Sequence, residues 1–189
     1  MAARTNAWAM IIYPDSAPLN FEEVISNMHI PCALSPLHEP DPNDGQQYKP
    51  HYHLLLRYDS VKNIEQVEDD TRLLNGTRPE RVNVFRSYYR YLCHLDEGPE
   101  KPHYDVNLIK CFSGFDPKDA NKPTDTQIYQ MIKEIVQYIA ENQIMYYIDL
   151  LLMCMFDDSA PPDWGYTVAH NTTLFSGACE SLRKKNRGL

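Results

Sequence analysis

The pattern of apolar residues changes once along this chain of 189 residues, just after Phe115. Before that point, short apolar runs that end at prolines or polar residues alternate with segments of helical periodicity. This alternation is typical of strands and helices that share one sheet-containing domain. After that point, helical periodicity alone continues. The sequence therefore predicts an α+β domain followed by a small all-α domain.

Four apolar runs in the first domain are predicted to be strands, and three other segments are predicted to be helices. The strands are expected at residues 7–13, 31–36, 51–58 and 81–85, and the helices at 20–28, 62–74 and 87–94. Two successive strand–helix–strand units favour an antiparallel sheet that helices cover on one face.

Residues 117–125 contain two prolines and no large apolar residue, so we expect a hinge there between domains at 1–116 and 126–189. The second domain begins with an amphipathic helix at 126–141, whose apolar residues form one stripe. The next run, 144–156, is apolar nearly all round. It is expected to pack on two sides, within the domain or between subunits, which makes this domain a candidate for oligomerisation.

Composition gives a less direct indication of function. The formal net charge is −8, from 26 acidic and 18 basic residues, whereas nucleic-acid-binding proteins usually have a basic excess. Basic residues do cluster locally, with five arginines between positions 72 and 90 and a basic run at 183–187. We find no apolar run that fits a membrane span or a signal peptide, and the five cysteines fit reduced thiols. A cytoplasmic protein is therefore expected.

The first candidate functional residues are His51 and His53, which flank Tyr52 at the start of a predicted strand. Side chains two residues apart on a strand point to the same face, so two imidazoles placed this way can converge on one metal ion. The pair alone is a weak signal, because short motifs often match by chance.

A second pair, His38 and Asp41, lies in the turn after the predicted strand 31–36. If the two strands are neighbours, this pair can join His51 and His53 around a divalent ion and leave positions for solvent or substrate. The alternative is that His38 and Asp41 hydrogen-bond within their own loop. Four candidate ligands within 16 residues favour the metal site, and its imidazole content favours Mn²⁺ over Mg²⁺.

Three tyrosines, Tyr88, Tyr89 and Tyr91, lie on the predicted helix 87–94. Tyrosines at helical spacing are more often packing residues than nucleophiles. Near a metal ion, however, a tyrosine can attack a phosphodiester, although its hydroxyl, with an ordinary pKa of about 10, needs activation. Tyr88 and Tyr91 are one helical turn apart and could face the same cleft. Whether Tyr88 or Tyr89 acts as a second nucleophile is therefore an open question at this point.

Together these motifs resemble those of the HUH endonucleases, and in particular the RepB-family replication initiators of rolling-circle plasmids from Gram-positive bacteria. The resemblance extends over nearly the whole chain. It rests on the segments AMIIYPDS, SPLHEPD, KPHYHLLL and YYRYLCH and on the RKKNRG tail.

The resemblance implies a ferredoxin-like HUH nuclease domain in which His38, Asp41, His51 and His53 hold the metal and Tyr91 is the nucleophile. It also implies site-specific nicking and strand transfer at the double-strand origin through a 5′-phosphotyrosine. The helical domain would then assemble the protein, as a hexamer. The implied partners are plasmid origin DNA, other copies of the chain and the host replication machinery.

Several residues and functions stay open at this stage. Lys49, Arg86 and Arg90 are candidate DNA contacts, and for Arg86 and Arg90 a solvated helix face is an equal alternative. His94 and His103 follow the tyrosine helix, where histidines are more often surface or capping residues. Two other functions are a transposase or relaxase of the same superfamily, and a metal-stabilised DNA-binding regulator whose tyrosines only pack. Metal-dependent covalent attachment to DNA would separate the enzymes from the regulator.

Overall fold

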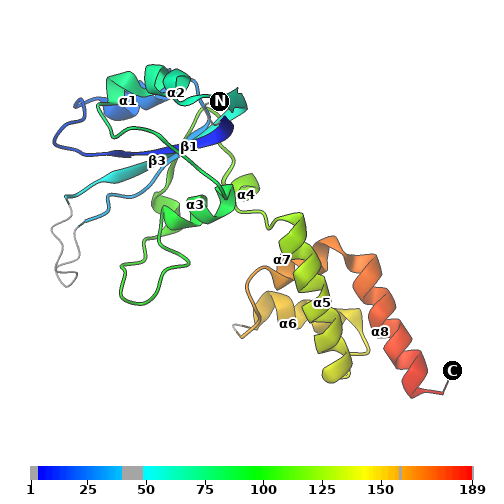
Figure 1. The fold of residues 1–189 in the computed structure, drawn as a ribbon. Helices are drawn as coiled ribbons and strands as arrows, with labels where there is room; N and C mark the ends of the chain where they lie inside the picture. Colours follow the sequence, from blue (N-terminus) through cyan, green and yellow to red (C-terminus); the bar gives the residue numbers. More distant parts are fainter. Residues whose placement is uncertain (1–3, 40–48, 158, 189) are drawn as a thin grey trace. The chain divides into compact units, whose positions relative to one another are not determined.

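The computed structural model describes residues 4–39, 49–157 and 159–188. The chain divides into two compact units, Met1–Lys122 and Pro123–Leu189. The first unit is α+β and the second is all-α, which confirms the predicted fold class (Figure 1). None of the helices in the described ranges is long and apolar enough to cross a membrane.

A five-stranded antiparallel sheet, in the order β4-β1-β3-β2-β5, forms the centre of the first unit. The central strands β1 and β3 are long because most of their residues are apolar, and the sheet is buried on both faces. The sequence did not predict β5, since three residues give too short a pattern. The strands are β1 (Thr5–Ile12), β2 (Cys32–Leu34), β3 (Tyr52–Lys62), β4 (Glu80–Arg81) and β5 (Lys110–Phe112).

Helices cover both faces of the sheet, so the prediction of one covered face is wrong (Figure 1). α1 and α2 pack on the face that presents Trp8 and Leu54. α3 and α4 pack on the opposite face, where the small side chains of Ala7, Ala9 and Ala33 provide room. The helical elements are α1 (Phe21–Asn27), α2 (Ile64–Thr71), η1 (Arg72–Leu74), α3 (Phe85–Tyr91), η2 (Val106–Leu108) and α4 (Pro117–Ala120).

The segment predicted as a hinge, 117–125, contains more structure than expected. Its first residues form α4, which Asp116 caps by accepting a hydrogen bond from the amide of Lys118. Ala120, at the end of α4, is buried in the core of the first unit. The next helix begins at Asp125, so the connection between the two units is shorter than the composition indicated.

Four helices form the second unit around one apolar core. α6 contributes Leu150 to this core, whereas Ile148, Met155 and Phe156 on the same helix are exposed. The helices are α5 (Asp125–Glu141), α6 (Tyr147–Phe156), α7 (Trp164–His170) and α8 (Thr172–Asn186). The core residues are Ile135, Ile139, Leu150, Trp164, Val168, Phe175 and Cys179.

Candidate active site

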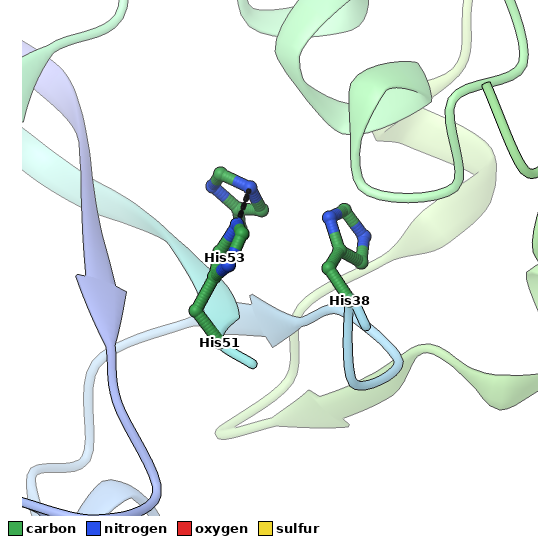
Figure 2. A group of neighbouring side chains, drawn as sticks. All are labelled: His38, His51 and His53. Atoms are coloured by element: carbon green, nitrogen blue, oxygen red, sulfur yellow. Dashed lines mark hydrogen bonds between the residues drawn. The ribbon is translucent and has the colours of Figure 1, made fainter. Parts of the chain in front are cut away.

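Three histidines meet where the start of β3 passes the turn after β2 (Figure 2). His51 and His53 share one face of the strand, the face that α3 covers, because they are two residues apart. His38 pairs with His51: the His38 amide donates to the His51 carbonyl at 2.8 Å, and the His51 amide donates back at 3.0 Å. One ring nitrogen of each histidine lies within 4.8 Å of the others. The structure thus brings together three of the four predicted ligands, and Asp41 lies outside the described residues.

Main-chain carbonyls fix the tautomers of two of these histidines. His51 Nδ1 lies 2.9 Å from the carbonyl oxygen of Lys49, and His38 Nε2 lies 3.0 Å from that of Leu92. A carbonyl oxygen only accepts, so each of these nitrogens donates a hydrogen. The neutral rings therefore present lone pairs at His51 Nε2 and His38 Nδ1. Hydrogen bonds of this kind orient the histidines of metal sites in proteins.

His53 lies between His51 and Tyr88, and its two ring nitrogens contact one of them each. Its Nε2 is 3.2 Å from Nε2 of His51, and its Nδ1 is 3.2 Å from the Tyr88 hydroxyl (Figure 2 draws the first contact). Without a cation, His53 Nε2 donates to the lone pair of His51, and Nδ1 accepts from Tyr88. If Nε2 held a cation through its lone pair, Nδ1 would instead donate to the hydroxyl oxygen. Tyr88 suits both forms because a hydroxyl donates and accepts.

Burial keeps His38 and His53 in the neutral form that binds metal ions. His38 is 3% and His53 is 4% exposed. Burial is the main cause that lowers the pKa of His38 to about 4 and that of His53 to about 3, and nearby positive charge lowers both further. Three imidazoles fit a divalent transition-metal ion better than Mg²⁺, which prefers oxygen ligands.

α3 presents two of its three tyrosines to the histidines. The Tyr91 ring lies 5.2 Å from that of His53 and 5.8 Å from that of Tyr88. Tyr89 is buried in the sheet–helix core against Phe115, and burial raises its pKa to about 12. Burial raises the pKa of Tyr88 as well. Tyr91 is partly exposed, and its hydroxyl forms no hydrogen bond within the described part of the chain.

The three predicted DNA-contact residues all have partners within the chain. Lys49 Nζ lies 3.0 Å from a carboxylate oxygen of Asp15, and both side chains are exposed. Arg90 holds the Asp96 carboxylate through Nε and Nη2 at 2.7–2.9 Å. Arg86 Nε donates to the Asn121 carbonyl at 2.8 Å. The contacts of Arg86 and Arg90 tie α3 to its surroundings, and a role for all three side chains in DNA binding stays a prediction.

Two residues surround His38: His94, for which the sequence favoured a surface or capping role, and Tyr104, which no sequence motif singled out. His94 is buried, its Nδ1 donates to the Pro102 carbonyl at 2.9 Å, and its ring lies 4.4 Å from that of His38. Tyr104 stacks on His38 at 4.7 Å with the rings parallel to within 1°, and its hydroxyl accepts from the Glu39 amide. The loop after α3 brings both residues in, and no local pattern shows this. His103, by contrast, is exposed.

The backbone of His94 shows how the loop leaves α3. Its φ of 55° is left-handed, a position that glycine usually holds at a helix end. The Leu95 amide donates to the Arg90 carbonyl and the His94 amide to the Tyr91 carbonyl, which together form a Schellman motif. A non-glycine residue in this conformation costs about 1 kcal/mol. The buried His94 ring packs against His38, a contact that a glycine at this position could not make.

Residues 1–118 match the family described as the plasmid replication protein, origin binding domain. The chain belongs to this plasmid replication protein family. It is 36% identical over 173 residues to a replication protein RepB of Lactiplantibacillus plantarum, covering 91% of this chain and 78% of that protein. It is 33% identical over 163 residues to a replication protein of Staphylococcus aureus, covering 84% and 81%. The resemblance to RepB-type proteins is therefore confirmed. In this plasmid replication protein, the matched residues contain the histidine cluster and α3.

Proposed function

We propose that this protein initiates rolling-circle plasmid replication by nicking one strand of the origin with Tyr91. The observation that supports this most directly is the approach of Tyr91, whose hydroxyl forms no hydrogen bond among the described residues, to a cluster of three imidazoles. Membership of a plasmid replication family with an origin-binding domain supplies the substrate, which is origin DNA.

His38, His51 and His53 would hold the metal, with Asp41 as a proposed fourth ligand. The imidazole-rich set favours Mn²⁺ over Mg²⁺. When bound, the ion supplies Lewis acidity toward a phosphodiester oxygen. The carbonyls of Lys49 and Leu92 orient two of the rings, and the Tyr88 hydroxyl orients the third.

Tyr91 is better suited to attack than Tyr88. The Tyr88 hydroxyl is hydrogen-bonded to His53 in a partly buried position, whereas the Tyr91 hydroxyl has no hydrogen bond in the described structure. Lys101 Nζ lies 5.8 Å from the Tyr91 ring centroid and adds positive charge beside the nucleophile. Tyr91 Oη forms a bond to phosphorus, and the bond from phosphorus to the 3′ oxygen breaks. Tyr91 loses its phenolic proton and the leaving 3′ oxygen gains one to become a hydroxyl. The 5′ phosphate stays covalently attached to the tyrosine.

Incubation of the protein with supercoiled plasmid that contains its own origin tests this proposal. Mn²⁺ should convert the plasmid to nicked or relaxed DNA with protein on a 5′ end, and EDTA or the substitution Tyr91→Phe should abolish this. Tyr89→Phe is the matched control, because it alters a tyrosine of the same helix that faces the core. Origin binding without nicking under all conditions would contradict the proposal and favour a metal-stabilised regulator.

We further propose that the second unit assembles the protein into a ring-shaped oligomer, a hexamer by the family resemblance. The exposed apolar residues of α6 support this part of the proposal. Extension of the free 3′ end would then fall to the host replication machinery.

A further inference from the structure

A cavity of about 500 Å³ lies beside the tyrosine helix, on the side of β4. Tyr88 and Tyr91 form one wall, and the edge of β4 with the turn into α3 forms another. The Tyr91 ring borders both this cavity and the histidine cluster. A strand whose phosphodiester reaches Tyr91 can therefore place an adjacent nucleotide in the cavity.

The charge of the cavity favours a base over a phosphate. Two acidic residues, Asp96 and Glu97, and one basic residue, Arg81, line it, so negative charge is in excess and repels phosphates. Both carboxylates already form ion pairs with side chains of the protein: Asp96 with Arg90 at 2.7 Å, and Glu97 with Lys101 at 3.5 Å. Their charge is thereby partly neutralised, which leaves a polar wall that a neutral ring can approach.

The remaining walls have the chemistry that recognises a base. The rings of Tyr88 and Tyr91 and the exposed side chain of Val84 offer aromatic and apolar contact. Asn83 and Ser87 offer hydrogen-bonding groups, and among the described residues neither side chain has a partner. Stacking on aromatic side chains combined with a few polar contacts is the usual way in which proteins hold an unpaired base.

We propose that this cavity binds the base of the nucleotide next to the nicked phosphodiester and contributes to the choice of nick site. The inference rests on the proposed function for one point, the location of the bound base next to the nicked phosphodiester. That the cavity binds a base does not depend on nicking. The ligand is a single unpaired nucleobase of the origin strand. Tyr88 and Tyr91 hold its face, and Asn83 and Ser87 contact its edge.

An abasic scan tests this proposal by binding alone. Fluorescence anisotropy measures the affinity of the protein for single-stranded origin oligonucleotides in which one abasic site is moved along the strand. The affinity of the protein for the oligonucleotide should fall about tenfold when the abasic site is at one particular position. Ser87→Leu, which fills the cavity with a helix-compatible side chain, and Asn83→Ala, which only removes an amide, should both reduce this loss. Arg78→Ala is the control, since Arg78 precedes β4 and pairs with Glu68 outside this cavity.

The outcomes separate this inference from the proposed function. A loss at one position that Ser87→Leu and Asn83→Ala reduce, and Arg78→Ala does not, supports the base site. Nicking by wild-type protein should map directly beside that position. Losses below about twofold at every position, or a loss that none of the cavity variants changes, would overturn the inference even if Tyr91 nicks DNA. A base-dependent loss without any nicking would overturn the proposed function and leave the base site standing.

Discussion

The hydroxyl of Tyr88 offers the sharpest test of how the histidine cluster is organised. Tyr88→Phe removes the hydroxyl that lies 3.2 Å from His53 Nδ1 and leaves the ring in place. In the metal-bound form, His53 Nδ1 would then be a buried donor without a partner. Loss of such an outer hydrogen bond typically costs about 10- to 100-fold in metal affinity. This range corresponds to about 1.4–2.7 kcal/mol.

Calorimetric titration of the purified protein with Mn²⁺ measures this effect. Tyr88→Phe should weaken Mn²⁺ binding by about 10- to 100-fold, and saturating metal should restore covalent attachment to DNA. Tyr91→Phe is the matched control, because it removes a hydroxyl from the neighbouring ring that is not bonded to a histidine. It should bind Mn²⁺ like the wild type and form no adduct. Unchanged Mn²⁺ affinity in Tyr88→Phe, with the adduct lost at saturating metal, would refute this reasoning and make Tyr88 the nucleophile.

Three further predictions concern stability and assembly. Because burial lowers the folded-state pKa of His38 to about 4, against about 6.5 unfolded, the unfolded metal-free chain takes up the proton first as the pH falls. The free energy of unfolding should therefore fall between about pH 6.5 and 4, by about 3 kcal/mol from His38 alone. If denaturant titrations of the first unit give the same free energy of unfolding across this pH range, the prediction is contradicted. Mn²⁺ at about 100 times its dissociation constant should stabilise the protein by about 2.7 kcal/mol in thermal or denaturant unfolding, and His53→Ala should remove most of this gain. Ile148 lies on the exposed side of α6, and Ile148→Glu should shift the sedimentation coefficient toward that of the monomer. The control Glu141→Gln, at the exposed end of α5, should leave the sedimentation coefficient unchanged. A wild-type protein that sediments as a monomer at micromolar concentration would argue against assembly through α6.

The sequence was sufficient for the parts of the site that depend on local pattern. The two-residue period of a strand placed His51 and His53 on one face, and the turn after the preceding strand placed His38 beside them. The three-residue spacing on a helix placed Tyr88 and Tyr91 together. These relations follow from the geometry of single elements or of neighbouring strands.

Features that depend on packing between distant segments could not be predicted in this way. His94 and Tyr104 reach His38 only because the loop after α3 turns through a left-handed residue and folds back. Helices cover both faces of the sheet because small and large apolar residues alternate on β1, a distinction that an apolar-or-polar pattern does not make. The proposed division of roles between Tyr88 and Tyr91 rests on a single hydrogen bond to His53.

The identity of the residue that becomes attached to DNA tests the central claim most directly. Trypsin cuts after Arg86 and Arg90, so Tyr88 and Tyr89 fall in the peptide 87–90, whereas Tyr91 begins the next one. The protein is incubated with origin DNA and Mn²⁺ and treated with nuclease, and its tryptic peptides are then analysed by mass spectrometry. The account predicts a nucleotide mass on the peptide that begins at Tyr91. A nucleotide mass on the peptide 87–90 would contradict it.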